Sequence, residues 1–138
     1  MLTKNDLERL AQVRLDDALF LFQANRSASA YYLAGYAVEL ALKACISKLM
    51  QPNIIPDKNF IDEIYTHKIN DLMSIAGLRP QFELDIKADP QLAAYWAIVN
   101  NWSEKSRYEF WDPISAATLL QAVNDPDHGV FQWVKKHW

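Results

Sequence analysis

The fold is decided by the stretch Ser29-Ala-Tyr-Tyr-Leu-Ala-Gly-Tyr-Ala-Val-Glu-Leu-Ala-Leu-Lys-Ala-Cys-Ile-Ser-Lys48, which is apolar around almost the whole circumference of a helix. A helix of this kind is buried by its neighbours, so we expect the rest of the chain to pack around it. Four polar side chains recur at spacings of three and four and therefore share one side of this helix: Tyr32, Tyr36, Glu39 and Lys43. Because a lone charge in an apolar environment is costly, we expect Glu39 and Lys43 to pair or to line a polar cleft.

The composition indicates an all-α protein. The chain has 138 residues, of which 51% are hydrophobic and 22% are charged, as in ordinary globular domains. A chain of this length can bury a single core, so we expect one domain over residues 1–138. Only three glycines are present, which is little material for hairpin turns or phosphate-binding loops.

Charge and cysteine content exclude several classes of protein. The net charge of -3 argues against a non-specific DNA-binding protein, so we expect no DNA partner. Cys45 is the only cysteine and cannot form an intramolecular disulfide or a cysteine-rich zinc site. The three histidines have no short ligand spacing, so neither a metal nor a cofactor is expected. No signal peptide or membrane span is recognisable, which predicts a cytoplasmic protein.

Capping residues and apolar periodicity predict the helices and their limits. Thr3 and Asp6 match a capping box, Gly77 matches a C-terminal cap, and three Asp-Pro pairs match helix starts. The predicted helices cover residues 3–25, 27–50, 68–76, 90–106, 114–123 and 126–134, with one or two more turns at 60–65. Whether the last two form one kinked helix is open at this point. Residues 51–59 and 79–87 are predicted to be connections.

Arg107 and Tyr108 form the first candidate binding feature. An arginine binds phosphate bidentately, and a neighbouring aromatic face stacks a base, which suits a nucleotide or single-stranded RNA. The structural alternative pairs Arg107 with Glu39 or Glu104 and places Tyr108 in the core. From the sequence alone we favour the structural pairing, because ion pairs that hold loops to helices are common, and binding stays the alternative.

His67 is the second candidate, because it lies just before the helix predicted at residues 68–76. Its ring can cap that helix, which is the interpretation we favour, or it can titrate near neutral pH as an acid or base. Cys45 lies within an apolar helix, where a thiol is usually inert packing. Nucleophilic catalysis is therefore not expected.

The stretch Ala30-Tyr-Tyr-Leu-Ala-Gly-Tyr-Ala-Val-Glu-Leu-Ala-Leu-Lys-Ala44 resembles the second helix of the HEPN family, the higher eukaryote and prokaryote nucleotide-binding domain. Further short motifs come in the family's order: Arg14 with Asp17-Ala18, His67 followed by Ile69 and Leu72, and Ser106-Arg107-Tyr108 after a long helix. The likeness extends from about residue 7 to residue 133. It implies an up-and-down bundle of four to five helices, often a two-fold dimer with a polar cleft between subunits.

One departure from the family pattern concerns catalysis. Ribonuclease members carry an arginine followed, after four to six residues, by a histidine. Arg107 would need that histidine at position 112, 113 or 114, where this chain has Asp112, Pro113 and Ile114. A site without its acid or base loses much of its cleavage power, so the resemblance implies a member without catalytic residues.

These observations lead to one main hypothesis and two alternatives. The main hypothesis is a homodimeric HEPN-like module that binds a nucleotide or RNA and is the accessory partner of a small nucleotidyltransferase, as in toxin–antitoxin pairs. The candidate cleft residues are Tyr36, Glu39, Lys43, His67, Arg107 and Tyr108. One alternative is a ribonuclease that combines Arg107 with His67 or Glu39. The other is a purely structural dimeric adaptor.

Overall fold

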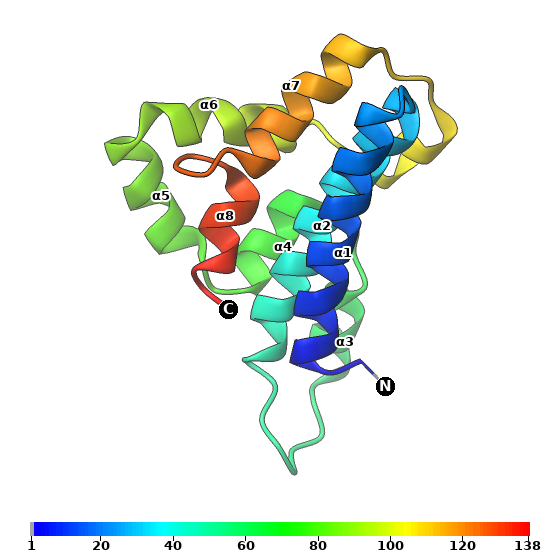
Figure 1. Cartoon of the computed structure of the whole chain (residues 1–138). Coiled ribbons are helices and arrows are strands. Elements are labelled where there is room, and N and C mark those ends of the chain that lie inside the picture. The colour runs from blue at the N-terminus through cyan, green and yellow to red at the C-terminus, as the bar shows by residue number, and fades with distance from the viewer. Residues whose placement is uncertain (1) are drawn as a thin grey trace.

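The computed structural model describes residues 2–138, and within this range it is helical, with no strand (Figure 1). The predicted all-α bundle is confirmed, but the described residues form eight α-helices and one 3-10 helix, more than the four to five helices that the resemblance implies. Their bounds are α1 Lys4–Gln23, α2 Ser27–Ser47, α3 Lys58–Ile64, α4 Ile69–Ile75, α5 Arg79–Ala88, α6 Pro90–Val99, η1 Glu104–Tyr108, α7 Pro113–Asn124 and α8 Val130–Lys135.

The long helices α1 and α2 form an antiparallel hairpin along one side of the molecule (Figure 1). Thr3 and Asp6 form the predicted capping box at the start of α1. At its other end Asn25 has a φ of 61°, and the backbone N–H of Arg26 donates to the carbonyl oxygen of Leu21 at 2.8 Å. Asparagine tolerates this left-handed conformation, which ends α1 and turns the chain back into α2.

Helix α2 is the centre of the core, as the sequence predicts. It packs against α1, α4, α7, α8 and η1, so its buried residues lie all around the helix. Glu39 is the only ionisable carboxylate among the fully buried side chains of the described part of the chain. Between residues 2 and 138, no helix is both long and apolar enough to cross a membrane.

The segment 79–87, predicted to be a connection, is helical instead. It forms α5, which lies with α6 on the side of the molecule opposite α1 (Figure 1). The buried ring of Phe82 packs edge-on against Trp96 and Trp133, with ring centroids 4.8 Å away in both cases. This packing of residues distant in sequence stabilises a helix that local propensity alone does not indicate.

The helix predicted over residues 90–106 is also divided. Asp89 and Pro90 start α6 as predicted, but α6 ends at Val99 and the short helix η1 begins at Glu104. Trp102, between them, is buried against α2 at Gly35. If α6 continued as one helix through residue 106, Trp102 would point in a different direction. Burial of its indole on α2 therefore favours the end of α6 at Val99.

The predicted restart of a helix at Asp125-Pro126 is wrong. Asp125 accepts hydrogen bonds from the backbone N–H groups of Asp127 and His128, which forms a tight turn. Helix α8 starts later, at Val130, with Gly129 at its N-cap. Helices α7 and α8 are therefore separate helices rather than one kinked helix. Gly77 does end α4, with a φ of +73°, as its capping role predicts.

Candidate functional site

Glu39 is a buried carboxylate at the centre of a polar cluster that reaches the surface at His67. Its side chain is only 1% exposed, and Oε1 accepts hydrogen bonds from Lys43 Nζ at 3.0 Å and from His67 Nδ1 at 2.8 Å. The pairing of Glu39 with Lys43 is therefore the ion pair that the sequence predicts. The second oxygen, Oε2, is buried and has no hydrogen-bond partner among residues 2–138.

His67 connects this cluster to η1. While Nδ1 faces Glu39, Nε2 lies 3.2 Å from Oε2 of Glu104, at the start of η1. The ring of His67 therefore links a carboxylate of α2 to a carboxylate of η1. The favoured interpretation of His67 as a helix cap is wrong, because Lys68 occupies the N-cap of α4 and no side chain caps it.

Tyr36 lies near Glu39 and is the first of three stacked aromatic rings. The rings of Tyr36 and Tyr32 have centroids 5.8 Å apart, and those of Tyr32 and Trp102 are 6.0 Å apart. Burial raises the pKa of Tyr36, and the nearby carboxylate of Glu39 raises it further. This stack joins the polar side of α2 to the segment that leads into η1.

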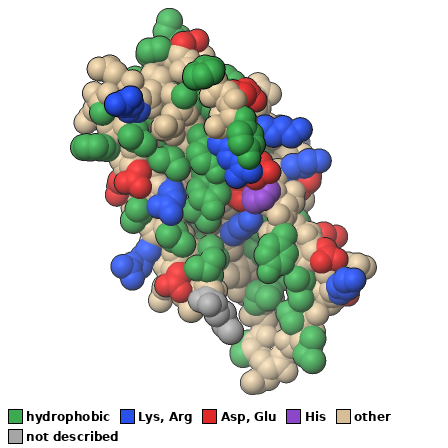
Figure 2. Space-filling view, turned by 90° about the vertical axis from the view of Figure 1, so that its right-hand side faces the viewer, with side chains coloured by type: hydrophobic (Ala, Val, Ile, Leu, Met, Phe, Trp, Pro, Cys, Tyr) green, Lys and Arg blue, Asp and Glu red, His purple; other side chains and the backbone are tan. Residues whose placement is uncertain are grey.

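A cleft of about 590 Å³ opens beside His67, between the start of α4 and the segment that precedes and begins η1. Its lining mixes charged, amide and aromatic side chains: Thr66, His67, Lys68, Ile69, Asn70, Asp71, Asn100, Trp102, Ser103, Glu104 and Lys105. Figure 2 shows a histidine at the surface with acidic and basic side chains around it, beside a band of hydrophobic side chains.

Arg107 and Tyr108 project outward from η1. The guanidinium carbon of Arg107 lies 4.8 Å from the centre of the Tyr108 ring, and Tyr108 is 76% exposed. The alternative that places Tyr108 in the core is therefore wrong. Arg107 forms no ion pair within the described chain, and Glu104 contacts His67 instead. The pairing of Arg107 with Glu39 or Glu104 is thus not present.

A second, smaller cleft of about 310 Å³ lies where the end of α1, the beginning of α2 and η1 meet. Its lining consists of Leu21, Ala28, Ser29, Tyr32, Leu33, Ser106, Arg107 and Glu109. Ser106 is 3% exposed, and its hydroxyl has no partner among the residues described. The cleft therefore combines a cationic side chain with polar groups that the protein itself does not satisfy.

The structure thus divides the six predicted site residues into two groups. Tyr36, Glu39, Lys43 and His67 form the internal cluster around the buried carboxylate of Glu39, with His67 at its exposed edge, whereas Arg107 and Tyr108 lie outside it on η1. Sequence reasoning missed Glu104 as the second partner of His67 and Ser106 as part of a cleft, because neither role leaves a spacing signal.

The described side chains contain no cluster of three or more His, Cys, Asp or Glu residues that could hold a metal ion. Protein-family models, curated proteins and solved structures were all compared with this chain, and none of them matches it.

Proposed function

We propose that this protein is a non-catalytic, HEPN-like module that binds a nucleotide or RNA through Arg107 and Tyr108. One observation carries the proposal: an exposed guanidinium lies over an exposed tyrosine ring and is in no ion pair with the rest of the described chain. Such a guanidinium is available to bind phosphate bidentately, and the ring offers a face on which a base stacks. The HEPN-like assignment itself rests on the sequence resemblance.

The internal cluster of Glu39, Lys43 and His67 positions the η1 segment that carries Arg107 and Tyr108. Glu39, Lys43 and His67 are already paired with one another, so they have little capacity left for a ligand. His67 instead holds η1, through Glu104, against the buried helix α2. In this proposal the cluster positions the segment that carries Arg107 and does not itself contact the nucleotide or RNA.

The same geometry supports a non-catalytic role. A general base needs a ring nitrogen that is free to take a proton from the substrate, and both nitrogens of His67 face carboxylates. The arginine–histidine spacing of the ribonuclease members is also absent at Arg107. RNA cleavage by the purified protein that is lost in His67→Ala would overturn this part of the proposal.

The proposal includes two protein partners, a second copy of the chain and a small nucleotidyltransferase. Both follow from the sequence resemblance. Exposed apolar side chains around Tyr108, namely Phe110 and Ile114, support a protein contact at this end of the molecule. Native mass spectrometry of the protein purified from its own host tests both: recovery of the monomer alone would contradict them.

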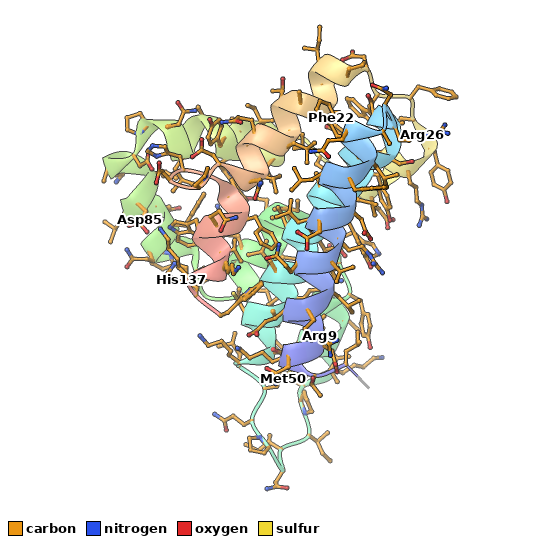
Figure 3. All side chains as sticks on the ribbon, in the orientation of Figure 1. Arg9, Phe22, Arg26, Met50, Asp85 and His137 are labelled. Carbon is orange, nitrogen blue, oxygen red and sulfur yellow. The ribbon has the colours of Figure 1, made fainter. Side chains whose placement is uncertain are left out.

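The binding proposal is tested with RNA-binding measurements on matched charge variants. We expect Arg107→Ala to weaken binding of a short single-stranded RNA by about tenfold or more, because charge-assisted hydrogen bonds to phosphate are lost. Tyr108→Ala should weaken it by a similar factor through lost stacking. Arg9→Ala is the control, since Arg9 lies at the far end of the α1–α2 hairpin from Arg26 (Figure 3). Equal affinity of wild type and Arg107→Ala would refute the site.

A further inference from the structure

We infer that the smaller cleft is a site for a phosphate monoester, the terminal phosphate of a nucleotide or of an RNA end. The cleft lies between the beginning of α2 and η1 and includes Arg107. The inference rests on the proposed function, since Arg107 serves both, but it adds a defined chemical group and a defined place. Three observations support it.

The first observation is the uncapped start of α2. This helix of 21 residues begins at Ser27, and its N-cap residue, Arg26, makes no side-chain capping hydrogen bond. The backbone N–H groups of Ser27, Ala28 and Ser29 have no acceptor within residues 2–138. Together with the positive end of the helix dipole, free N–H groups at this position favour an anion. Ala28 and Ser29 line the cleft.

The second observation is independent of the helix. Ser106, on η1, lines the same cleft, is only 3% exposed, and has a hydroxyl without a partner in the described chain. A buried hydroxyl without a partner costs free energy, which a ligand oxygen can offset. The η1 segment therefore brings a buried hydroxyl without a partner to the wall of the cleft.

The third observation is the balance of charge in the cleft. Arg107 supplies a cation without a carboxylate partner in the described chain, and Tyr32 adds a second hydroxyl. Glu109 also lines the cleft, and its negative charge opposes an anion. The guanidinium and the helix terminus outnumber this single carboxylate.

The cleft has several hydrogen-bond donors and a cation, which match a phosphate monoester better than an internal phosphodiester. A terminal phosphate has three non-bridging oxygens and up to two negative charges near neutral pH, whereas an internal phosphodiester has two such oxygens and one charge. The cleft volume of about 310 Å³ is at the low end for ligand sites, so it fits the end of a ligand better than a length of chain.

The test compares ligands that differ only in this phosphate. Binding of adenosine 5′-monophosphate is compared with binding of adenosine, and a 5′-phosphorylated oligoribonucleotide is compared with its 5′-hydroxyl form. We expect the phosphorylated member of each pair to bind about tenfold or more tightly. Equal affinities within both pairs would overturn the inference.

Substitutions at Ser29 test the place of the site. Ser29→Asp puts a carboxylate in the first turn of α2, where it favours the helix but repels phosphate, so we expect the melting temperature to be kept and the phosphate preference to be lost. Ser29→Asn introduces a side chain of the same shape as aspartate but without its charge, so this variant should keep most of the preference for the phosphorylated ligand. Glu109→Gln should increase the preference. A Ser29→Asp variant that keeps the full preference would place the phosphate elsewhere.

The same experiments separate this inference from the proposed function. The affinity for 5′-hydroxyl RNA, and its dependence on Arg107 and Tyr108, reports on the proposed function. The affinity ratio within each pair reports on the monoester site. RNA binding without a preference for the phosphorylated form overturns the inference alone. If adenosine 5′-monophosphate binds more tightly than adenosine but RNA does not bind, the site is supported and its ligand is a nucleotide. Absence of all binding overturns both.

Discussion

The indole ring of Trp102 lies directly against Gly35, in the middle of the buried helix α2. A Cβ added to Gly35 would overlap three atoms of the indole, well inside the 3.0 Å that real Cβ atoms keep from their neighbours. The glycine therefore makes room for Trp102, which in turn holds the segment before η1 on the core. The position of the candidate binding face depends on this contact.

We expect Gly35→Ala to lower the free energy of unfolding by about 1–3 kcal/mol through overpacking, although alanine is the better helix former by roughly 1 kcal/mol. Urea unfolding of both proteins measures the difference. Combining Gly35→Ala with Trp102→Leu should recover part of the loss, because the two residues are in direct contact. A Gly35→Ala protein as stable as wild type would contradict this prediction, because overpacking would then cost no more than the helix propensity of alanine contributes.

Removal of the buried carboxylate should also destabilise the protein. Glu39→Ala leaves Lys43 and His67 without their shared acceptor, for an expected loss of roughly 3 kcal/mol, moderated because both partners retain contact with water. Glu39→Gln should lose less, since an amide oxygen still accepts a hydrogen bond. Hydrogen exchange should become faster in η1, which His67 ties to Glu39. Unchanged exchange there would contradict the positioning role of the cluster.

The pair Asp89–His128 predicts a pH-dependent stability. His128 Nδ1 lies 2.7 Å from Oδ2 of Asp89; this hydrogen bond raises the pKa of His128 above its ordinary 6.5 and lowers the pKa of Asp89 below 3.8. The contribution of His128 to the free energy of unfolding is complete below pH 6.5 and is lost as the pH rises through the raised pKa of His128. The aspartate contribution is complete above pH 3.8 and is lost as the pH falls through the lowered pKa.

The variant that tests this pair is Asp89→Asn, because asparagine still caps α6 but carries no charge. Its deficit in unfolding free energy should be largest between about pH 5 and pH 6 and should shrink in mild alkali. Urea titrations across this range provide the measurement. A deficit that is constant with pH would mean that the charge of the pair contributes nothing to stability.

Cys45 should be inert in the folded protein. Burial raises the pKa of its thiol to about 11, and Sγ lies 3.8 Å from the carbonyl oxygen of Val134. Because the thiolate is the reactive form, a thiol reagent at pH 8 should modify native protein only as fast as it unfolds. Labelling rates with and without urea measure this. Rapid modification of the native protein would contradict the buried position.

Most of the features that depend on short-range sequence were predicted correctly, although the helix start at Asp125-Pro126 was not. The apolar circumference of residues 29–48 predicted the central helix, and the caps at Thr3, Asp89 and Gly77 occur as expected. The pairing of Glu39 with Lys43 was also predictable, because a spacing of four places both on one side of a helix. These features follow from contacts within a few residues along the chain.

The remaining features depend on residues far apart in sequence. Helix α5 exists because Phe82 packs between Trp96 and Trp133, and η1 separates from α6 while Trp102 reaches Gly35. The contact of His67 with Glu39, 28 residues away, likewise leaves no local pattern.

The sequence by itself therefore determined that this protein is all-helical, which helix lies at its centre and where most helices begin. Only the tertiary structure decided that Glu104 completes the contacts of His67, that Arg107 and Tyr108 are exposed, and that Ser106 lines a cleft together with the start of α2. The physical reason is the range of the interactions. Helix formation and capping act within one or two turns, whereas burial and charge pairing depend on which surfaces meet when the chain folds.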